Sequence, residues 1–209
     1  MAVDTILFGD CRNTLKTLEE KPRMCVTSPP YYGLRDYGGE ESQIGQEQTP
    51  EEYIQSLVEV FRSVRDVLAD DGTLWVNIGD SYYNYRPGKG QSYPKQSVSK
   101  TKQDLPEQCN QRGNKLEGLK EKDLIGIPWM LAFALRADGW YLRQDIIWHK
   151  PNPMPESVRD RCTKSHEYLF LLIKNKKYYY DNEAIKEPVK QDWGTRNRDN
   201  GKYHKEGTG

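Results

Sequence analysis

The stretch of the chain that is most informative about the fold is Met24–Tyr31, M-C-V-T-S-P-P-Y. Met24–Thr27 is a short, mostly apolar run that predicts a β-strand. The strand ends there, because the two prolines that follow have no N–H to donate to a sheet and disfavour helix in the residue before each of them. In an open α/β sheet, ligands bind beyond the carboxyl ends of the strands. We therefore expect Ser28–Tyr31 to form a stiff corner at a ligand-binding edge.

The segments around this corner alternate short apolar runs with amphipathic stretches, which is typical of β-α-β units. The clearest helix follows Thr49, where Thr49, Pro50 and Glu52 form a capping box with proline at the first helical position. Other helices are expected at Arg12–Leu18 and from Ile127 to Asp138. The predicted strands are Val3–Phe8, Met24–Thr27, Thr73–Ile78, Tyr141–Trp148 and Glu167–Ile173, with a hairpin turn at Lys174–Lys177 leading into Tyr178–Tyr180.

Length and composition exclude several classes of protein. The chain has 209 residues, enough for one medium domain, and no window approaches the ~18 uninterrupted apolar residues of a membrane span. The first residues lack a secretory signal, so a cytoplasmic protein without a membrane partner is expected. The four cysteines are scattered without metal-site spacing, and His149 and His166 lack partners at such spacing, so neither a disulfide framework nor a metal is predicted.

The charge of the chain is balanced overall but unevenly distributed. Residues 1–85 carry 7 basic and 15 acidic side chains, whereas residues 86–209 carry 24 and 16. The segment Asn84–Lys122 is polar and basic, with few apolar residues, which predicts an insertion that is mobile without a nucleic acid and contacts the nucleic acid when it is bound. A solvated surface without a nucleic-acid partner is the alternative explanation of the charge.

The corner Ser28–Tyr31 suits a planar ring that bears an exocyclic amine. The Ser28 hydroxyl and the Pro29 carbonyl can accept hydrogen bonds from the amine, and the Tyr31 ring can stack on the base. Taken alone, the four residues could also be a turn with a core tyrosine.

Ser28-Pro29-Pro30-Tyr31 resembles the catalytic motif of the amino-methyltransferases, which transfer a methyl group from S-adenosylmethionine to an exocyclic nitrogen of a DNA base. The serine form resembles the N4-cytosine enzymes of restriction–modification systems, whereas aspartate at this position is commoner in N6-adenine enzymes. Further segments resemble the family as well: Gly9-Asp10, Gly72–Tyr82, Ile146–Pro155 and His166–Asn175. The resemblance implies a Rossmann-like α/β fold with helices on both faces of a mainly parallel sheet that contains an antiparallel strand near Glu167–Ile173.

The resemblance also implies roles for particular residues. Ser28, Pro29, Pro30 and Tyr31 would be catalytic, and Asp10 and Thr27 would bind the cofactor, S-adenosylmethionine. The residues expected to contact double-stranded DNA are Trp148, Lys150, Asn152 and Arg159. Two of these residues also have a purely structural interpretation, since Asp10 could be a helix N-cap and Trp148 a core residue.

The chain departs from the family where the glycine-rich cofactor loop is expected. In members that begin with the catalytic motif, this loop lies near the C-terminus, but the late glycines here follow no apolar strand. We therefore expect an incomplete sheet, with the cofactor loop supplied beyond Gly209 or by a second chain. The alternatives are an adenine or RNA target and a non-catalytic binding remnant.

Four regions follow from these patterns. They are a catalytic part (residues 1–83), a basic insertion (84–122), the remainder of the α/β domain (123–185), and a polar tail or the start of a target-recognition region (186–209).

Overall fold

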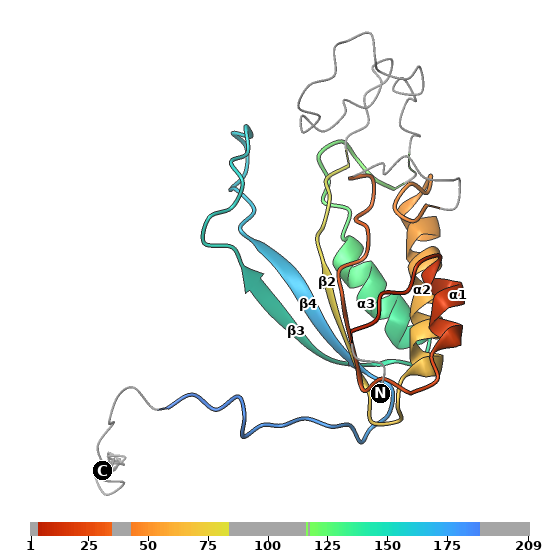
Figure 1. Cartoon of the computed structure of the whole chain (residues 1–209). Coiled ribbons are helices and arrows are strands. Elements are labelled where there is room, and N and C mark those ends of the chain that lie inside the picture. The colour runs from red at the N-terminus through yellow and green to blue at the C-terminus, as the bar shows by residue number, and fades with distance from the viewer. Residues whose placement is uncertain (1–3, 35–42, 84–115, 117, 189–209) are drawn as a thin grey trace, which may run out of the picture. The chain divides into compact units, whose positions relative to one another are not determined.

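The computed structural model describes residues 4–34, 43–83, 116 and 118–188. The chain divides into two compact units, Met1–Tyr179 and Tyr180–Gly209, and every helix and strand named below belongs to the first. In chain order these are α1 (Cys11–Thr14), the 3-10 turn η1 (Leu15–Thr17), β1 (Met24–Thr27), α2 (Pro50–Val67), β2 (Thr73–Ile78), α3 (Ile127–Ala137), β3 (Tyr141–His149) and β4 (His166–Ile173) (Figure 1). Most of the predicted basic insertion lies outside the described residues.

The four strands form one mixed sheet in the order β1-β2-β4-β3. β1 and β2 are parallel, with Thr27 opposite Val76. β4 is antiparallel to both of its neighbours, β2 and β3, so three strands point the same way and β4 alone is reversed. This confirms the predicted antiparallel strand at Glu167–Ile173. In β3 the register shifts between Leu142 and Gln144, which leaves Arg143 as a bulge.

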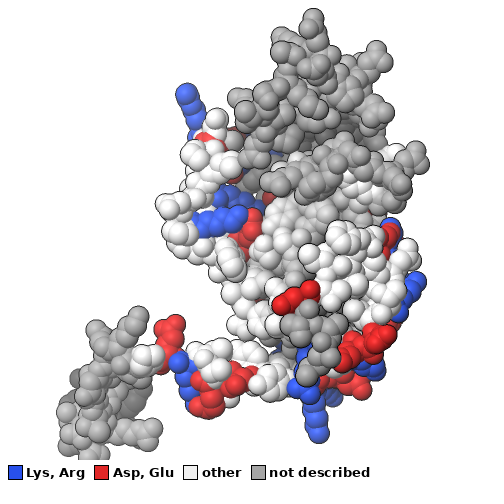
Figure 2. Space-filling view, in the orientation of Figure 1, with Lys and Arg blue, Asp and Glu red and all other residues white. Residues whose placement is uncertain are grey.

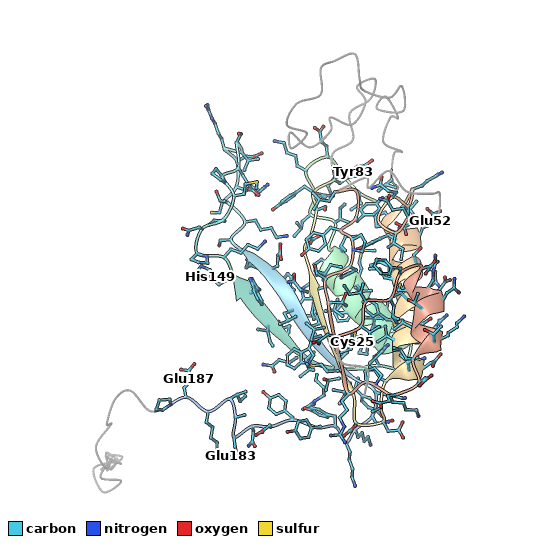
Figure 3. All side chains as sticks on the ribbon, in the orientation of Figure 1. Cys25, Glu52, Tyr83, His149, Glu183 and Glu187 are labelled. Carbon is cyan, nitrogen blue, oxygen red and sulfur yellow. The ribbon has the colours of Figure 1, made fainter. Side chains whose placement is uncertain are left out.

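Helix α2 begins at the predicted cap. The Thr49 hydroxyl accepts a hydrogen bond from the Glu52 backbone N–H, and the Glu52 carboxylate accepts one from the Thr49 N–H. The apolar face of the helix is buried, and its largest side chains, Tyr53 and Phe61, are 0% and 1% exposed. Because β1, α2 and β2 form a parallel crossover, the start of α2 and the end of β2 lie at the same end of the domain, where Glu52 and Tyr83 are labelled (Figure 3).

Helix α3 begins at a cap that comes from the end of β2. The Asp80 carboxylate accepts hydrogen bonds from the backbone N–H groups of Gly126 and Ile127, at 3.0 Å each. The buried side of α3 packs against α2 and the sheet, and Trp129 makes edge-on ring contacts with Tyr168 and Phe170 of β4. α2 and α3 thereby form one layer on one face of the sheet, the face that Cys25 of β1 also contacts (Figures 1 and 3).

The opposite face of the sheet is less covered by the described residues. Met24 and Val26 of β1 are 59% and 66% exposed, and no described helix packs over them. The expected helices on this second face are therefore not among the residues that the structure describes. The sheet is open at β1, which pairs with β2 alone among the described strands.

Two expected strands are absent from the described residues. Residues 4–8 are irregular, and Ile6 and Phe8 are 76% and 88% exposed, because no described strand lies beside them to accept their hydrogen bonds. The segment Tyr178–Tyr180 also forms no strand. The Tyr179 N–H instead donates to the carbonyl of Asp71 in a loop.

Three features outside the sheet bear on the other expectations. No described helix is both long and apolar enough to cross a membrane. Within the described ranges, no three His, Cys, Asp or Glu side chains gather as a metal site would require. The described cysteines Cys11, Cys25 and Cys162 are free thiols.

Candidate active site

The corner Ser28–Tyr31 follows directly on the end of β1 and is held by side chains from distant parts of the chain. The buried Tyr53 of α2 donates its hydroxyl to the Pro30 carbonyl at 2.7 Å. On the other side the Tyr31 ring packs against Gly79, where an added Cβ would lie 2.7 Å from Cε2 of the ring. Pro29 is buried and Ser28 is exposed, so the corner is anchored at its base and open at the serine.

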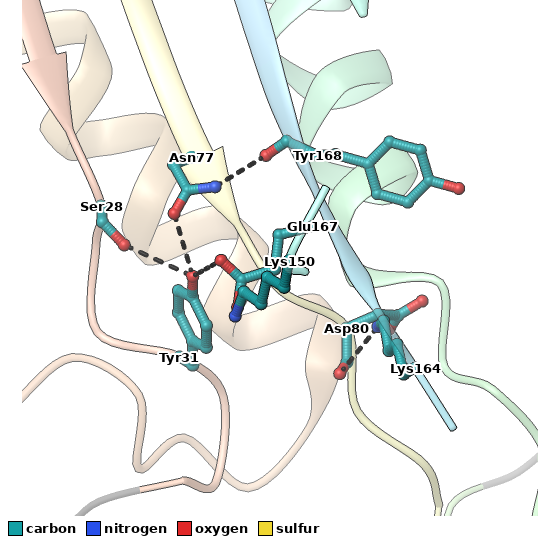
Figure 4. Close-up of polar contacts among 8 residues, drawn as sticks. All are labelled: Ser28, Tyr31, Asn77, Asp80, Lys150, Lys164, Glu167 and Tyr168. Atoms are coloured by element: carbon teal, nitrogen blue, oxygen red, sulfur yellow. Dashed lines mark hydrogen bonds and ion pairs between the residues drawn. The ribbon is translucent and has the colours of Figure 1, made fainter. Parts of the chain in front are cut away.

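The Tyr31 hydroxyl joins the corner that follows β1 to strands β2 and β4 (Figure 4). It lies 3.2 Å from Oδ1 of Asn77 on β2 and 3.1 Å from Oε2 of Glu167 on β4. The Ser28 hydroxyl reaches the same oxygen at 3.5 Å. Burial raises the pKa of the Tyr31 phenol, so the group stays protonated and acts as a donor at neutral pH.

Glu167 also forms an ion pair with Lys150, the first residue after β3. Burial raises the pKa of the Glu167 carboxyl, but the hydrogen bonds from Lys150, Tyr31 and Asn77 and the charge of Lys150 outweigh this effect. Its pKa therefore lies below its usual range. Glu167 is thus an ionised acceptor at neutral pH.

Two of the four predicted DNA-contacting residues lie at this site. Trp148 pairs with Glu167 across β3 and β4, and its side chain is 57% exposed rather than part of the core. Lys150 contacts Glu167 directly. Asn152 and Arg159 lie in the exposed loop that connects β3 to β4, and in the described part of the chain no hydrogen bond or ion pair joins either to Tyr31 or Glu167.

The surface near this end of the sheet carries both signs of charge. The upper end of the β3–β4 pair shows basic and acidic side chains side by side in Figure 2. Arg161 pairs with Glu156 and lies over the Tyr82 ring at 4.0 Å, and the Lys164 ammonium donates to the Asp80 carbonyl at 3.3 Å. Burial lowers the pKa of Lys164.

The two predicted cofactor residues have different surroundings. Thr27 ends β1 beside Ser28 and is half-buried. Asp10 is the N-cap of α1, and its carboxylate accepts hydrogen bonds from the backbone and guanidinium of Arg12. The side-chain and backbone hydrogen bonds from Arg12 lower the pKa of Asp10. The structure therefore gives Asp10 a capping role, and its cofactor role stays a prediction.

Sequence reasoning did not single out Asn77 or Glu167. Both are polar residues in otherwise apolar strands, T-L-W-V-N-I and H-E-Y-L-F-L-L-I. A polar residue at such a position needs a hydrogen-bonding partner, and that requirement was the available signal. Their common partner, Tyr31, becomes evident only when the two strands are placed side by side.

The site combines an exposed hydroxyl with a stiff carbonyl-bearing turn and an aromatic ring whose hydroxyl is anchored. Such groups can accept hydrogen bonds from a planar amine and stack against its ring. Together with the open sheet, they are typical of the class of Rossmann-like α/β methyltransferases. Within that class the chain belongs to the DNA methylase family, whose model matches residues 23–207.

Several type II methyltransferases are similar in sequence. Type II methyltransferase M.SmaI of Serratia marcescens is 55% identical over 185 residues, which cover 88% of this chain and 60% of that protein. Type II methyltransferase M.Cfr9I of Citrobacter freundii is 52% identical over 198 residues, which cover 93% of this chain and 62% of that protein. The chain therefore spans about three fifths of the length of these relatives.

Two solved structures share the fold. The PvuII DNA methyltransferase, described as cytosine-N4-specific, has a TM-score of 0.52 and 16% identity, over 83% of this chain and 50% of that chain. A DNA modification methylase from Thermus thermophilus, complexed with S-adenosyl-L-methionine, has a TM-score of 0.53 and 20% identity, over 84% and 55%. At this identity the likeness shows the α/β fold alone.

Proposed function

We propose that the protein transfers a methyl group from S-adenosylmethionine to the exocyclic amino group of a flipped DNA base, with N4 of cytosine as the favoured target. The observation that carries the proposal is the exposed Ser28 hydroxyl beside a Tyr31 ring that Asn77 and Glu167 anchor. Membership of the DNA methylase family and the names of the relatives support it. We place this reaction in the cytoplasm, as the modification step of a restriction–modification system.

The residues of the corner prepare the amine for reaction. The lone pair of an exocyclic amine is delocalised into the base, which makes the nitrogen a weak nucleophile. Hydrogen bonds from the amine to Ser28 Oγ and the Pro29 carbonyl favour a tetrahedral nitrogen with a localised lone pair, and they orient it. The base must leave the duplex stack at a cost of a few kcal/mol, which stacking on Tyr31 partly offsets.

Two described residues are our candidates for one part of a cofactor site. Thr27 lies next to Ser28 at the end of β1, and the Asp10 side chain, 35% exposed, already binds Arg12 through its carboxylate. When bound, S-adenosylmethionine supplies the electrophilic methyl group. Thr27 and Asp10 are the residues of this chain that would hold it.

We propose further that the rest of the cofactor site comes from chain beyond Gly209 or from a second chain, in the permuted order of the family. The unpaired edge of β1 and its exposed side chains Met24 and Val26 support this arrangement, since a further strand could pair there and cover them. The length of the relatives supports it as well.

The test is a methylation assay with labelled S-adenosylmethionine and unmodified DNA, followed by digestion and mass spectrometry of the nucleosides. We expect N4-methylcytosine from this chain or from a form extended past Gly209, and none from the Ser28→Ala variant of the active form. Formation of N6-methyladenine would mean that the reaction is the proposed one and that its target base is adenine. Methylation of RNA and not of DNA would mean that the substrate is RNA.

The assay also separates the enzyme from a binding remnant. Transfer by the extended form alone would assign the cofactor loop to the added segment. No transfer by either form, alone or with a second chain from the same system, would contradict the methyltransferase function and favour a non-catalytic DNA- or partner-binding protein.

A further inference from the structure

The four groups around the Tyr31 hydroxyl differ in what they can do in a hydrogen bond. The phenol has one proton to donate and two lone pairs to accept with. The Asn77 oxygen and the Glu167 carboxylate, at 3.2 and 3.1 Å, can only accept. Ser28 and the backbone of Gly79 also bond to this group.

The amide orientation of Asn77 is set by a separate contact. Its Nδ2 donates to the Tyr168 carbonyl at 3.2 Å, so its oxygen faces Tyr31 (Figure 4). Glu167 is held as a carboxylate by Lys150, and a hydrogen bond to a charged acceptor is roughly twice as strong as one between neutral groups. The Tyr31 proton is therefore directed to these acceptors, and mainly to Glu167.

The direction of this bond determines the direction of the next one. With its proton on the Glu167 side, the Tyr31 oxygen has lone pairs left, and Ser28 can bond to it only as a donor. The Ser28 proton then points toward Tyr31, and the lone pairs of Ser28 Oγ remain on its exposed side.

We propose that Glu167, paired with Lys150, is a positioning residue that orders the chain Ser28→Tyr31→Glu167 and thereby makes the Ser28 hydroxyl an acceptor for the target amine. The proposal rests on the proposed function for the identity of the amine. A serine hydroxyl can rotate and act as a donor, which would oppose an amine N–H. The distant carboxylate gives the neutral serine the acceptor character that an aspartate would have at the same position.

The first test measures the hydrogen bond without any substrate. In proton NMR of the protein we expect a downfield, slowly exchanging hydroxyl resonance that is lost in Tyr31→Phe. In Glu167→Gln it should move upfield, because the acceptor loses its charge. The matched control is Asp70→Asn, which removes a lysine-paired carboxylate before the start of β2, at the end of the strand away from the site. A Tyr31 resonance that is unchanged in Glu167→Gln would overturn the proposal.

The second test uses the form of the protein that transfers methyl groups. Glu167→Gln should lower kcat about tenfold to hundredfold and leave KM for DNA within about twofold, since the amine contact strengthens in the transition state. In a Ser28→Asp background, where the carboxylate accepts in every rotamer, the same change should alter kcat less than about twofold.

Each outcome of the second test has a meaning of its own. Equal losses in both backgrounds, or a rise in KM alone, would mean that Glu167 acts by another route and would overturn the proposal. If Glu167→Gln fails to fold, Tyr31→Phe, which keeps the ring, takes its place in the same comparison. Absence of transfer in every form would contradict the proposed function, and the NMR result would still decide whether Glu167 orders the chain.

Discussion

The Ser28–Tyr31 corner and the segment around Asp10 differ in how far along the chain their contacts reach. Tyr31 bonds to residues 46 and 136 positions away, and Pro30 accepts from a tyrosine 23 positions away. The Asp10 carboxylate bonds to Arg12, two positions away, and the neighbouring Phe8 is 88% exposed. The corner is therefore held by contacts from distant helices and strands, whereas the Asp10 segment is held by hydrogen bonds within its own turn.

This difference separates the two halves of the proposed reaction. The groups that would receive the base are held by α2, β2 and β4 within the described residues. Of the two proposed cofactor residues, Thr27 is held in the sheet by β1, whereas Asp10 is held by its own turn beside the uncovered Phe8. In the proposed reaction, the groups around the base are therefore fixed by distant contacts, and the Asp10 part of the cofactor site by local contacts alone.

The largest expected effect comes from removing the side chain that the sheet anchors. Tyr31→Ala loses both the stacking surface and the hydrogen bonds, together about 4 kcal/mol, so kcat/KM should fall about a thousandfold. In the same steady-state assay, Asp10→Ala should act mainly by raising KM for S-adenosylmethionine. Equal effects of Tyr31→Ala on the two KM values, with kcat unchanged, would contradict a separate base site.

A smaller effect should follow from removing the cation that pairs with Glu167. In Lys150→Met the pKa of Glu167 should rise, because the hydrogen bond and the charge of Lys150 that stabilise the carboxylate are gone. The acid limb of the pH profile of kcat should therefore move to higher pH. Lys174→Met, which removes a lysine paired with Asp70 outside the site, is the control and should leave the profile in place.

The lowered pKa of Glu167 also makes the stability of the fold depend on pH. Because the pKa of Glu167 is lower in the folded chain than its ordinary value of 4.5, ionised Glu167 contributes stability above that value. The contribution is lost as the pH falls through the folded pKa. Below pH 4.5, the free energies of unfolding of the wild type and of Lys150→Met, measured by urea titration, should therefore become more similar. A difference between the two free energies that does not change with pH would count against the ion pair.

A third effect, on stability, should distinguish the anchored corner from a free turn. Tyr53→Phe leaves the Pro30 carbonyl without its donor, which should lower the free energy of unfolding by about 1 kcal/mol. Tyr179→Phe, at a tyrosine that is 60% exposed, should change it by less than about 0.5 kcal/mol. Urea titrations of both variants make the comparison, and equal values would mean that the bond to Pro30 contributes nothing.

The smallest expected effect is on the local segment. Asp10→Ala removes the cap of a four-residue exposed helix and should lower the free energy of unfolding by about 0.5 kcal/mol, the low end for such caps. Asp10→Asn keeps a capping oxygen and should be near neutral. A loss of several kcal/mol in Asp10→Ala, measured in the same urea titrations, would mean that this segment is integral to the fold.

The sequence was a good guide where local chemistry decides the structure. The capping box of α2 and the end of β1 at the prolines follow from short patterns, and the structure confirms both. The antiparallel direction of β4 was implied by the resemblance to the family, and the structure confirms it as well. Residues 4–8 were predicted as a strand because apolar periodicity reports burial and does not report whether a neighbouring strand is present. The link from Tyr31 to Asn77 and Glu167 depends on the β1-β2-β4 strand order, which no local pattern encodes.

The close contact between Gly79 and Tyr31 has an evolutionary consequence. A Cβ at position 79 would overlap the ring at 2.7 Å, although the backbone there does not itself require glycine. As long as position 31 is a large aromatic residue, mutations at position 79 should be purged by selection. The two positions are therefore expected to change together across descendants of this sequence, and a side chain larger than glycine at 79 should mark a lineage in which the ring at 31 has been lost or has moved.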